Sequence, residues 1–109
     1  MTMMFYYCSK VKEINLKSFS TQKVENMMGM FKNCLSLSKL DLTSFVTKNV
    51  SSMEGMFGAC KNLKKLNLSS FNTERVTTMK MMFTRCGNLE SLDLSVFDTK
   101  NLTDMNSVL

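Results

Sequence analysis

The chain has 109 residues, 44% of them hydrophobic and 21% charged, and 14 Lys and Arg against 9 Asp and Glu give a formal net charge of +5. This length corresponds to one domain. The sequence contains no His, which removes the commonest general base of enzymes, and no apolar run approaches the roughly 18 residues that crossing a bilayer requires. The first residues have no basic leader, continuous apolar segment or small-residue cleavage site, so we expect neither a signal peptide nor an anchor in this chain.

One pattern is written four times without insertion, at about residues 4–29, 30–55, 56–81 and 82–107. Each copy opens with Met-Phe, continues through a Cys and three spaced aliphatic residues, and closes with Val or Leu and then Met. A fixed period of 20 to 50 residues indicates an array of stacked structural units. We therefore predict a single repeat array over residues 1–109.

Each repeat contains two local patterns, clearest in the second copy. Residues 37–45 (LSKLDLTSF) alternate apolar and polar side chains at Leu40-Asp41-Leu42, which predicts a short strand. Residues 50–57 place apolar side chains at i, i+3, i+6 and i+7, which predicts one face of a short helix. Thr47 lies three residues before Val50, where its hydroxyl would either cap that helix or belong to a Thr ladder in a turn.

The segments LDLTSFVTKNVSSMEGMFGAC and LDLSVFDTKNLTDM resemble the BspA-like leucine-rich repeat, which also occurs in surface lipoproteins of mycoplasmas. The resemblance extends over the whole chain. It implies the α/β class and a right-handed leucine-rich-repeat solenoid, with a parallel β-sheet on the concave side and short helices or turns on the convex side. It also implies a location at the cell surface or in secreted material.

Both ends of the sequence keep the register of the repeat. Met1 stands in the same column as Met27, and Val108 and Leu109 stand where the next Met-Phe would begin. Repeat arrays need polar caps at their ends. We therefore expect the chain to be a fragment of a longer array.

The strand residues that alternate with the buried Leu side chains are expected to face the concave side. This is the default binding face of a leucine-rich-repeat solenoid, although a merely solvated sheet face explains the same residues. Lys39 and Asp41 are expected to pair along the strand. The candidate binding residues are Lys39, Asp41, Thr43, Lys65, Asn67, Ser69, Ser91 and Asp93.

Cysteine and methionine columns raise the question of disulfides or a soft metal site. The four Cys are evenly spaced and accompanied by no Cys-x-x-Cys motif, so buried free thiols are favoured over disulfides and zinc. The Met stripe is expected to be core and not a Cu(I) site. We predict no metal and no cofactor.

Partners and activity follow from the remaining residues. The Lys side chains are scattered and the Phe side chains belong to apolar columns, which argues against nucleic acid, although Lys10–Lys12 and Lys61–Lys65 remain candidates for local anionic contacts. Three glycosylation acceptor patterns begin at Asn49, Asn67 and Asn101, but the repeat itself generates them.

No paired carboxylates, phosphate loop or unique nucleophile is present, so we predict that the chain is not an enzyme. The expected function is a non-catalytic protein-binding or adhesion module of a BspA-like surface protein, with a protein or another cell-surface macromolecule as partner and no membrane insertion. The alternative is an intracellular repeat scaffold or a truncated gene product without independent function.

Overall fold

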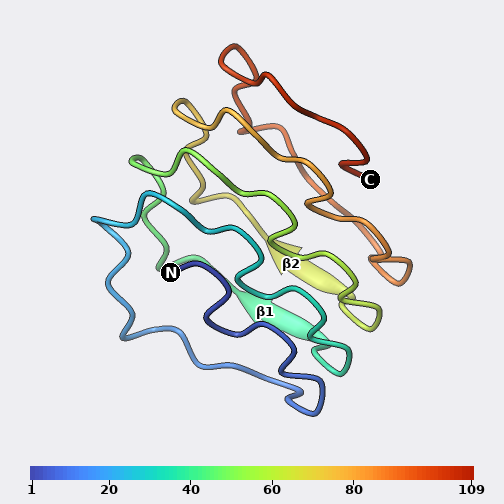
Figure 1. Ribbon diagram of the computed structural model, residues 1–109. Coiled ribbons are helices and arrows are strands. Elements are labelled where there is room, and N and C mark those ends of the chain that lie inside the picture. Colours follow the sequence, from blue (N-terminus) through green and yellow to red (C-terminus); the bar gives the residue numbers. More distant parts are fainter.

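The computed structural model describes residues 1–109, in which the chain winds into four stacked rungs (Figure 1). We define rung 1 as residues 4–29, rung 2 as 30–55, rung 3 as 56–81 and rung 4 as 82–107. Each rung lies beside the rungs that precede and follow it in sequence. The molecule measures 35 × 30 × 22 Å.

The predicted α/β class, a right-handed leucine-rich-repeat solenoid with a concave parallel sheet and short helices or turns on the convex side, is wrong, although turns are present. The structure contains no helix, and its regular elements are the two three-residue strands β1 (Lys39–Asp41) and β2 (Lys65–Asn67). These strands form a two-stranded parallel sheet. No sheet extends over all four rungs.

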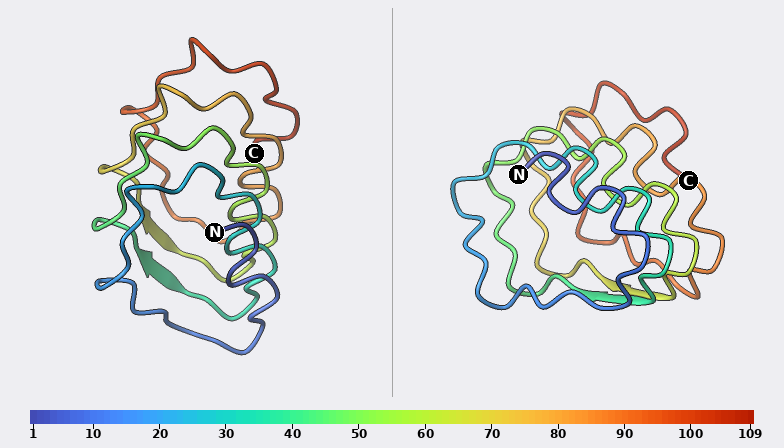
Figure 2. Two further views of the ribbon diagram at one scale, coloured as in Figure 1. Left: turned by 60° about the vertical axis from the view of Figure 1, so that its left-hand side comes forward. Right: turned by 60° about the horizontal axis from the view of Figure 1, so that its bottom comes forward.

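The expected helix at residues 50–57 is a run of turns whose amides have two kinds of partner. The N–H groups of Met53, Gly55 and Phe57 donate to carbonyls of the next rung, at 2.8–3.1 Å, while those of Met56 and Gly58 donate to the carbonyls three residues back along the chain. An α-helix instead needs every amide to donate four residues back. The apolar i, i+3 spacing therefore reports successive turns, and Figure 2 shows these runs stacked in all four rungs.

Positive φ angles also prevent a helix in this run. Gly55 has a φ of 59° and Ala59 has a φ of 59°, and the equivalent residues of the other rungs share this conformation. At the position of Gly55, the last two rungs carry Met81 and Ser107, with φ of 58° and 53°. A left-handed residue every four positions interrupts any α-helix.

The strands are short because their last residues turn the chain. The side-chain oxygen of Asp41 accepts the Thr43 N–H at 3.0 Å, and that of Asn67 accepts the Ser69 N–H at 2.9 Å. Asn and Asp form such local turns readily because their side-chain oxygen reaches the backbone two residues ahead. The sheet therefore ends where these side chains begin the turn.

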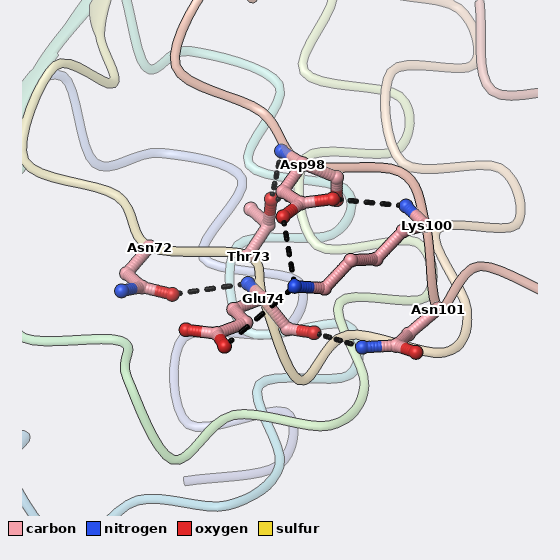
Figure 3. A network of polar contacts seen from close by, with 6 residues as sticks. All are labelled: Asn72, Thr73, Glu74, Asp98, Lys100 and Asn101. Carbon is pink, nitrogen blue, oxygen red and sulfur yellow. Dashed lines mark hydrogen bonds and ion pairs between the residues drawn. The ribbon is translucent and has the colours of Figure 1, made fainter.

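Buried threonines bind neighbouring rungs together. The Thr47 hydroxyl donates to the Asn72 carbonyl at 2.9 Å and accepts the Asn72 N–H at 2.8 Å. Thr73 makes the same pair of bonds to Asp98, within a wider polar network between rungs 3 and 4 (Figure 3). The helix-capping interpretation of Thr47 is therefore wrong, and the ladder interpretation is confirmed.

The core is a stack of equivalent apolar side chains. The rings of Phe5, Phe31, Phe57 and Phe83 lie nearly parallel, with successive centroids 5.4, 5.7 and 5.6 Å apart. The Met stripe belongs to the same core, because Met27, Met30, Met53 and Met56 are fully buried. Stacking thus removes from water the apolar surface that no single rung can bury alone.

The cysteine column lies within this stack and all four thiols are free. The prediction of buried free thiols holds for Cys34 and Cys60, whereas Cys8 and Cys86 are half-buried. The Cys60 thiol donates to the Phe31 carbonyl of the preceding rung, with 3.1 Å between Sγ and O. Burial raises the pKa of the Cys34 thiol to about 11 and also raises the pKa of the Cys60 and Cys86 thiols.

Candidate binding face

A depression of about 990 Å³ lies over the strand segments of the four rungs. Strands β1 and β2 cross its middle. Its lining is mostly polar, and rungs 1 to 4 all contribute to it. The lining residues are Glu13, Ile14, Asn15, Leu16, Lys17, Lys39, Leu40, Asp41, Thr43, Lys65, Leu66, Asn67, Glu90 and Ser91. We call this surface the strand face.

Most of the candidate residues from the sequence line the strand face, and all of these are exposed. They are Lys39, Asp41, Thr43, Lys65, Asn67 and Ser91. Ser69 and Asp93 are also exposed but do not line the depression. Alternation around the Leu columns was therefore a useful signal for which side chains share this surface, even though the sheet is much smaller than predicted.

Glu90 lines the depression but was absent from the candidates. It precedes the segment equivalent to β1 and β2 by one position, and its N–H donates to the Lys64 carbonyl at 3.1 Å. The equivalent residues in the other rungs are Lys12, Ser38 and Lys64. These four residues share no charge or polarity pattern from which their location could be predicted, so only the folded structure places Glu90 on this face.

Asp41 serves the architecture of the face as well as its surface. Its Oδ1 accepts the Thr43 hydroxyl at 2.6 Å and the Thr43 N–H at 3.0 Å. The hydroxyl bond, followed by the N–H bond, holds the pKa of Asp41 below its ordinary value. Its charged form is therefore kept over a wider acidic range, while this oxygen remains committed to the turn.

Lys39 and Lys65 occupy the same register position but have different surroundings. The Lys39 Nζ lies 3.1 Å from the Glu13 Oε1 of rung 1, so the expected pairing of Lys39 with Asp41 is wrong. Lys65 lies opposite Lys39 in the sheet. It has no carboxylate within ion-pair distance, because the ion pairs of the chain involve Lys39 and Lys100. In this column the face thus carries one paired and one unpaired ammonium side by side, and Lys17, which also lines the depression, is in none of the ion pairs either.

The chemistry offered by this face is hydrogen bonding and charge recognition. No group of three or more His, Cys, Asp and Glu side chains is arranged to hold a metal ion. No helix in the structure is long and apolar enough to cross a bilayer. Every buried side-chain nitrogen and oxygen has a hydrogen-bond partner, so the polar groups with spare bonding capacity lie at the surface.

The fold and this face define a protein of stacked, repeated rungs with an exposed polar surface over an apolar core. All 109 residues match the family described as "Mycoplasma protein of unknown function, DUF285", and the chain belongs to this family. No curated protein and no solved structure matches the chain.

Proposed function

We propose that this chain is a non-catalytic binding module of a BspA-like surface protein, located at the cell surface or secreted, and that it binds a protein or another surface macromolecule through the strand face. The main support is the depression itself, which gathers exposed polar side chains from all four rungs over a rigid core. Membership of a Mycoplasma family and the BspA-like text of the repeat support a role at the cell surface.

Rigidity favours this role. The lining side chains stand on rungs that are tied by main-chain bonds, by the threonine ladder and by the stacked Phe rings. Little conformational entropy is then lost when the face binds a partner. A volume of about 990 Å³ accommodates several side chains of a protein segment.

The test is binding of the labelled chain to cultured host cells, measured by flow cytometry with and without protease treatment of the cells. Ser91→Trp fills the depression from an exposed position, and Ser20→Trp is the matched control at an exposed position outside it. We expect saturable, protease-sensitive binding that Ser91→Trp abolishes and Ser20→Trp retains. If the wild-type chain shows no saturable binding, the intracellular or truncated alternative is favoured instead.

A further inference from the structure

We propose that the partner of the strand face presents a carboxylate, from an Asp or Glu side chain of an acidic protein segment, to the ammonium group of Lys65. This inference rests on the proposed binding function and names the chemistry of its partner. The observations that carry it are an uncompensated charge and a set of open hydrogen-bond donors around it.

The charge at Lys65 is uncompensated because of the order of residues across the rungs. The column that contains it reads Glu13, Lys39, Lys65 and Ser91. Glu13 holds the Lys39 ammonium at 3.1 Å, toward rung 1. Lys65 lies directly opposite Lys39, and like charges facing each other on adjacent strands are unfavourable. A carboxylate beside Lys65 would form an ion pair with its ammonium group, as Glu13 does with Lys39.

Two shorter side chains with unused hydrogen-bond donors share the depression with Lys65, one on the same strand and one in rung 4. Ser91 follows Lys65 in the column, and its hydroxyl makes no hydrogen bond in the structure. Asn67 uses its Oδ1 to accept the Ser69 N–H at 2.9 Å, which fixes the amide while its Nδ2 donates to no protein group. Lys65, Asn67 and Ser91 all line the same depression. An ammonium, an amide and a hydroxyl together satisfy the several lone pairs of a carboxylate.

The acidic side chains on the face decide between an isolated carboxylate and a polyanion. Glu13, Asp41 and Glu90 line the depression together with Lys17, Lys39 and Lys65, so its charge is balanced. A nucleic acid or an anionic membrane would bring several negative charges against Glu90 and Asp41. A protein segment can instead place one carboxylate at Lys65 and neutral or basic groups beside Glu90. Charge complementarity therefore favours a protein partner.

The experiment is an NMR titration of the full chain at low ionic strength with two peptides of Gly and Ser of equal length, one with a single central Glu and one with Gln at that place. We expect saturable shifts at Lys65, Asn67 and Ser91 with the Glu peptide and none with the Gln peptide. Lys65→Gln should weaken binding about two- to fivefold, as the loss of one exposed ion pair does. The matched control is Lys48→Gln, which removes the same charge at an exposed position outside the depression.

A gain-of-contact variant gives a second readout. Ser91→Glu places a carboxylate one rung beyond Lys65, as Glu13 stands one rung before Lys39. We expect it to compete with the Glu peptide and abolish the titration while the fold is retained by circular dichroism.

Four results would overturn the inference. Equal weakening by Lys65→Gln and Lys48→Gln would reduce the effect to net charge. Equal binding of the Gln peptide would show that the face does not recognise a carboxylate. A Lys65-dependent affinity for an oligonucleotide, or for phosphatidylserine vesicles, that matches the affinity for the Glu peptide would replace the protein partner. If Lys65→Gln leaves binding to cells intact while Ser91→Trp abolishes it, the proposed function stands and only its carboxylate partner is rejected.

Discussion

The two inner rungs (2 and 3) and the two outer rungs (1 and 4) carry nearly the same sequence pattern but differ in side-chain burial and in strand formation. Met30 and Met56 are 0% exposed, whereas Met4 at the same place in rung 1 is 48% exposed. Cys34 and Cys60 are buried, and Cys8 and Cys86 are half-buried. Both strands lie in the inner rungs.

The burial of a residue therefore depends on the rungs that lie beside it more than on the sequence of its own rung. A rung covered on both sides buries its Met, Phe and Cys completely, and its extended segment pairs as a strand. Rung 1, covered on one side, leaves Met4 exposed and Phe5 and Cys8 half-buried, whereas in rung 4 Met82 and Phe83 stay buried and Cys86 is half-buried. Repeat stability behaves in this way when each unit interacts only with its neighbours.

The largest expected effect comes from removing an inner Phe. Phe57 is 0% exposed, with its ring between those of Phe31 and Phe83. Phe57→Ala should lower the free energy of unfolding by about 3–5 kcal/mol. Phe5→Ala, which shortens a half-buried side chain of rung 1, should lower it by about 2 kcal/mol, because less apolar surface is buried there. Urea unfolding followed by circular dichroism measures both, and Phe57→Leu serves if the Ala variant does not fold. Equal losses at the two positions would break the comparison between inner and outer rungs.

The next effect concerns the threonine ladder. Thr47→Val removes the hydroxyl that satisfies both the N–H and the carbonyl of Asn72, so a loss of about 1–3 kcal/mol is expected. Thr99→Val, at the equivalent but exposed position of rung 4, should change stability by less than about 0.5 kcal/mol. Hydrogen exchange should locate the first loss at the Asn72 amide. Unchanged protection of Asn72 in Thr47→Val would show that the ladder does not hold the rungs together.

A smaller effect is expected from the left-handed glycine of rung 2. Gly55 has a φ of 59°, a conformation that costs a residue with a side chain about 1–2 kcal/mol. Gly55→Ala should therefore lower the free energy of unfolding by about 1 kcal/mol. Gly87→Ala is the control, since its φ is not positive and a Cβ there meets no atom within 4 Å. Thermal melting of the pair measures the difference, and an equal shift in both would argue against backbone strain.

The smallest expected effect is the contribution of the inner thiols to the pH dependence of stability, which is absent at neutral pH and appears in alkali. Burial raises the pKa of Cys34 from 9.0 to about 11. Because the folded-state pKa is the higher one, the stabilising contribution is fully present below pH 9 and is lost as the pH rises toward 11. The free energy of unfolding should fall more steeply over this window in the wild-type chain than in Cys34→Ala. Parallel pH profiles of the two proteins would contradict the assignment to Cys34.

Particular residues show how far the sequence predicted the fold. The columns of Phe31, Cys34 and Leu42 correctly identified core positions, because burial of a repeated apolar side chain is visible in its spacing. The helix at residues 50–57 was wrong because i, i+3 spacing is shared by helices and by successive turns. The N–H groups of Met53 and Gly55 donate to carbonyls of the next rung. The sequence of a single repeat therefore does not show their hydrogen-bond partners.

The candidate site divides in the same way. Alternation around Leu40 and Leu66 placed Lys39, Lys65 and Asn67 on one surface, and the structure brings them into one depression. The sequence did not reveal that Glu13 neutralises Lys39 and leaves Lys65 free. That distinction depends on side chains from different rungs meeting in space.

The repeat, its register and the apolar columns could all be read from the amino-acid sequence, since they follow from residue type and spacing. The folded structure was needed to show that the amides divide between turns and neighbouring rungs, that the sheet has only two short strands, and that Lys39 is paired while Lys65 beside it is not. The physical reason is that hydrogen bonds and ion pairs across rungs join residues about 26 positions apart. Their partners are therefore set by stacking and not by local preference.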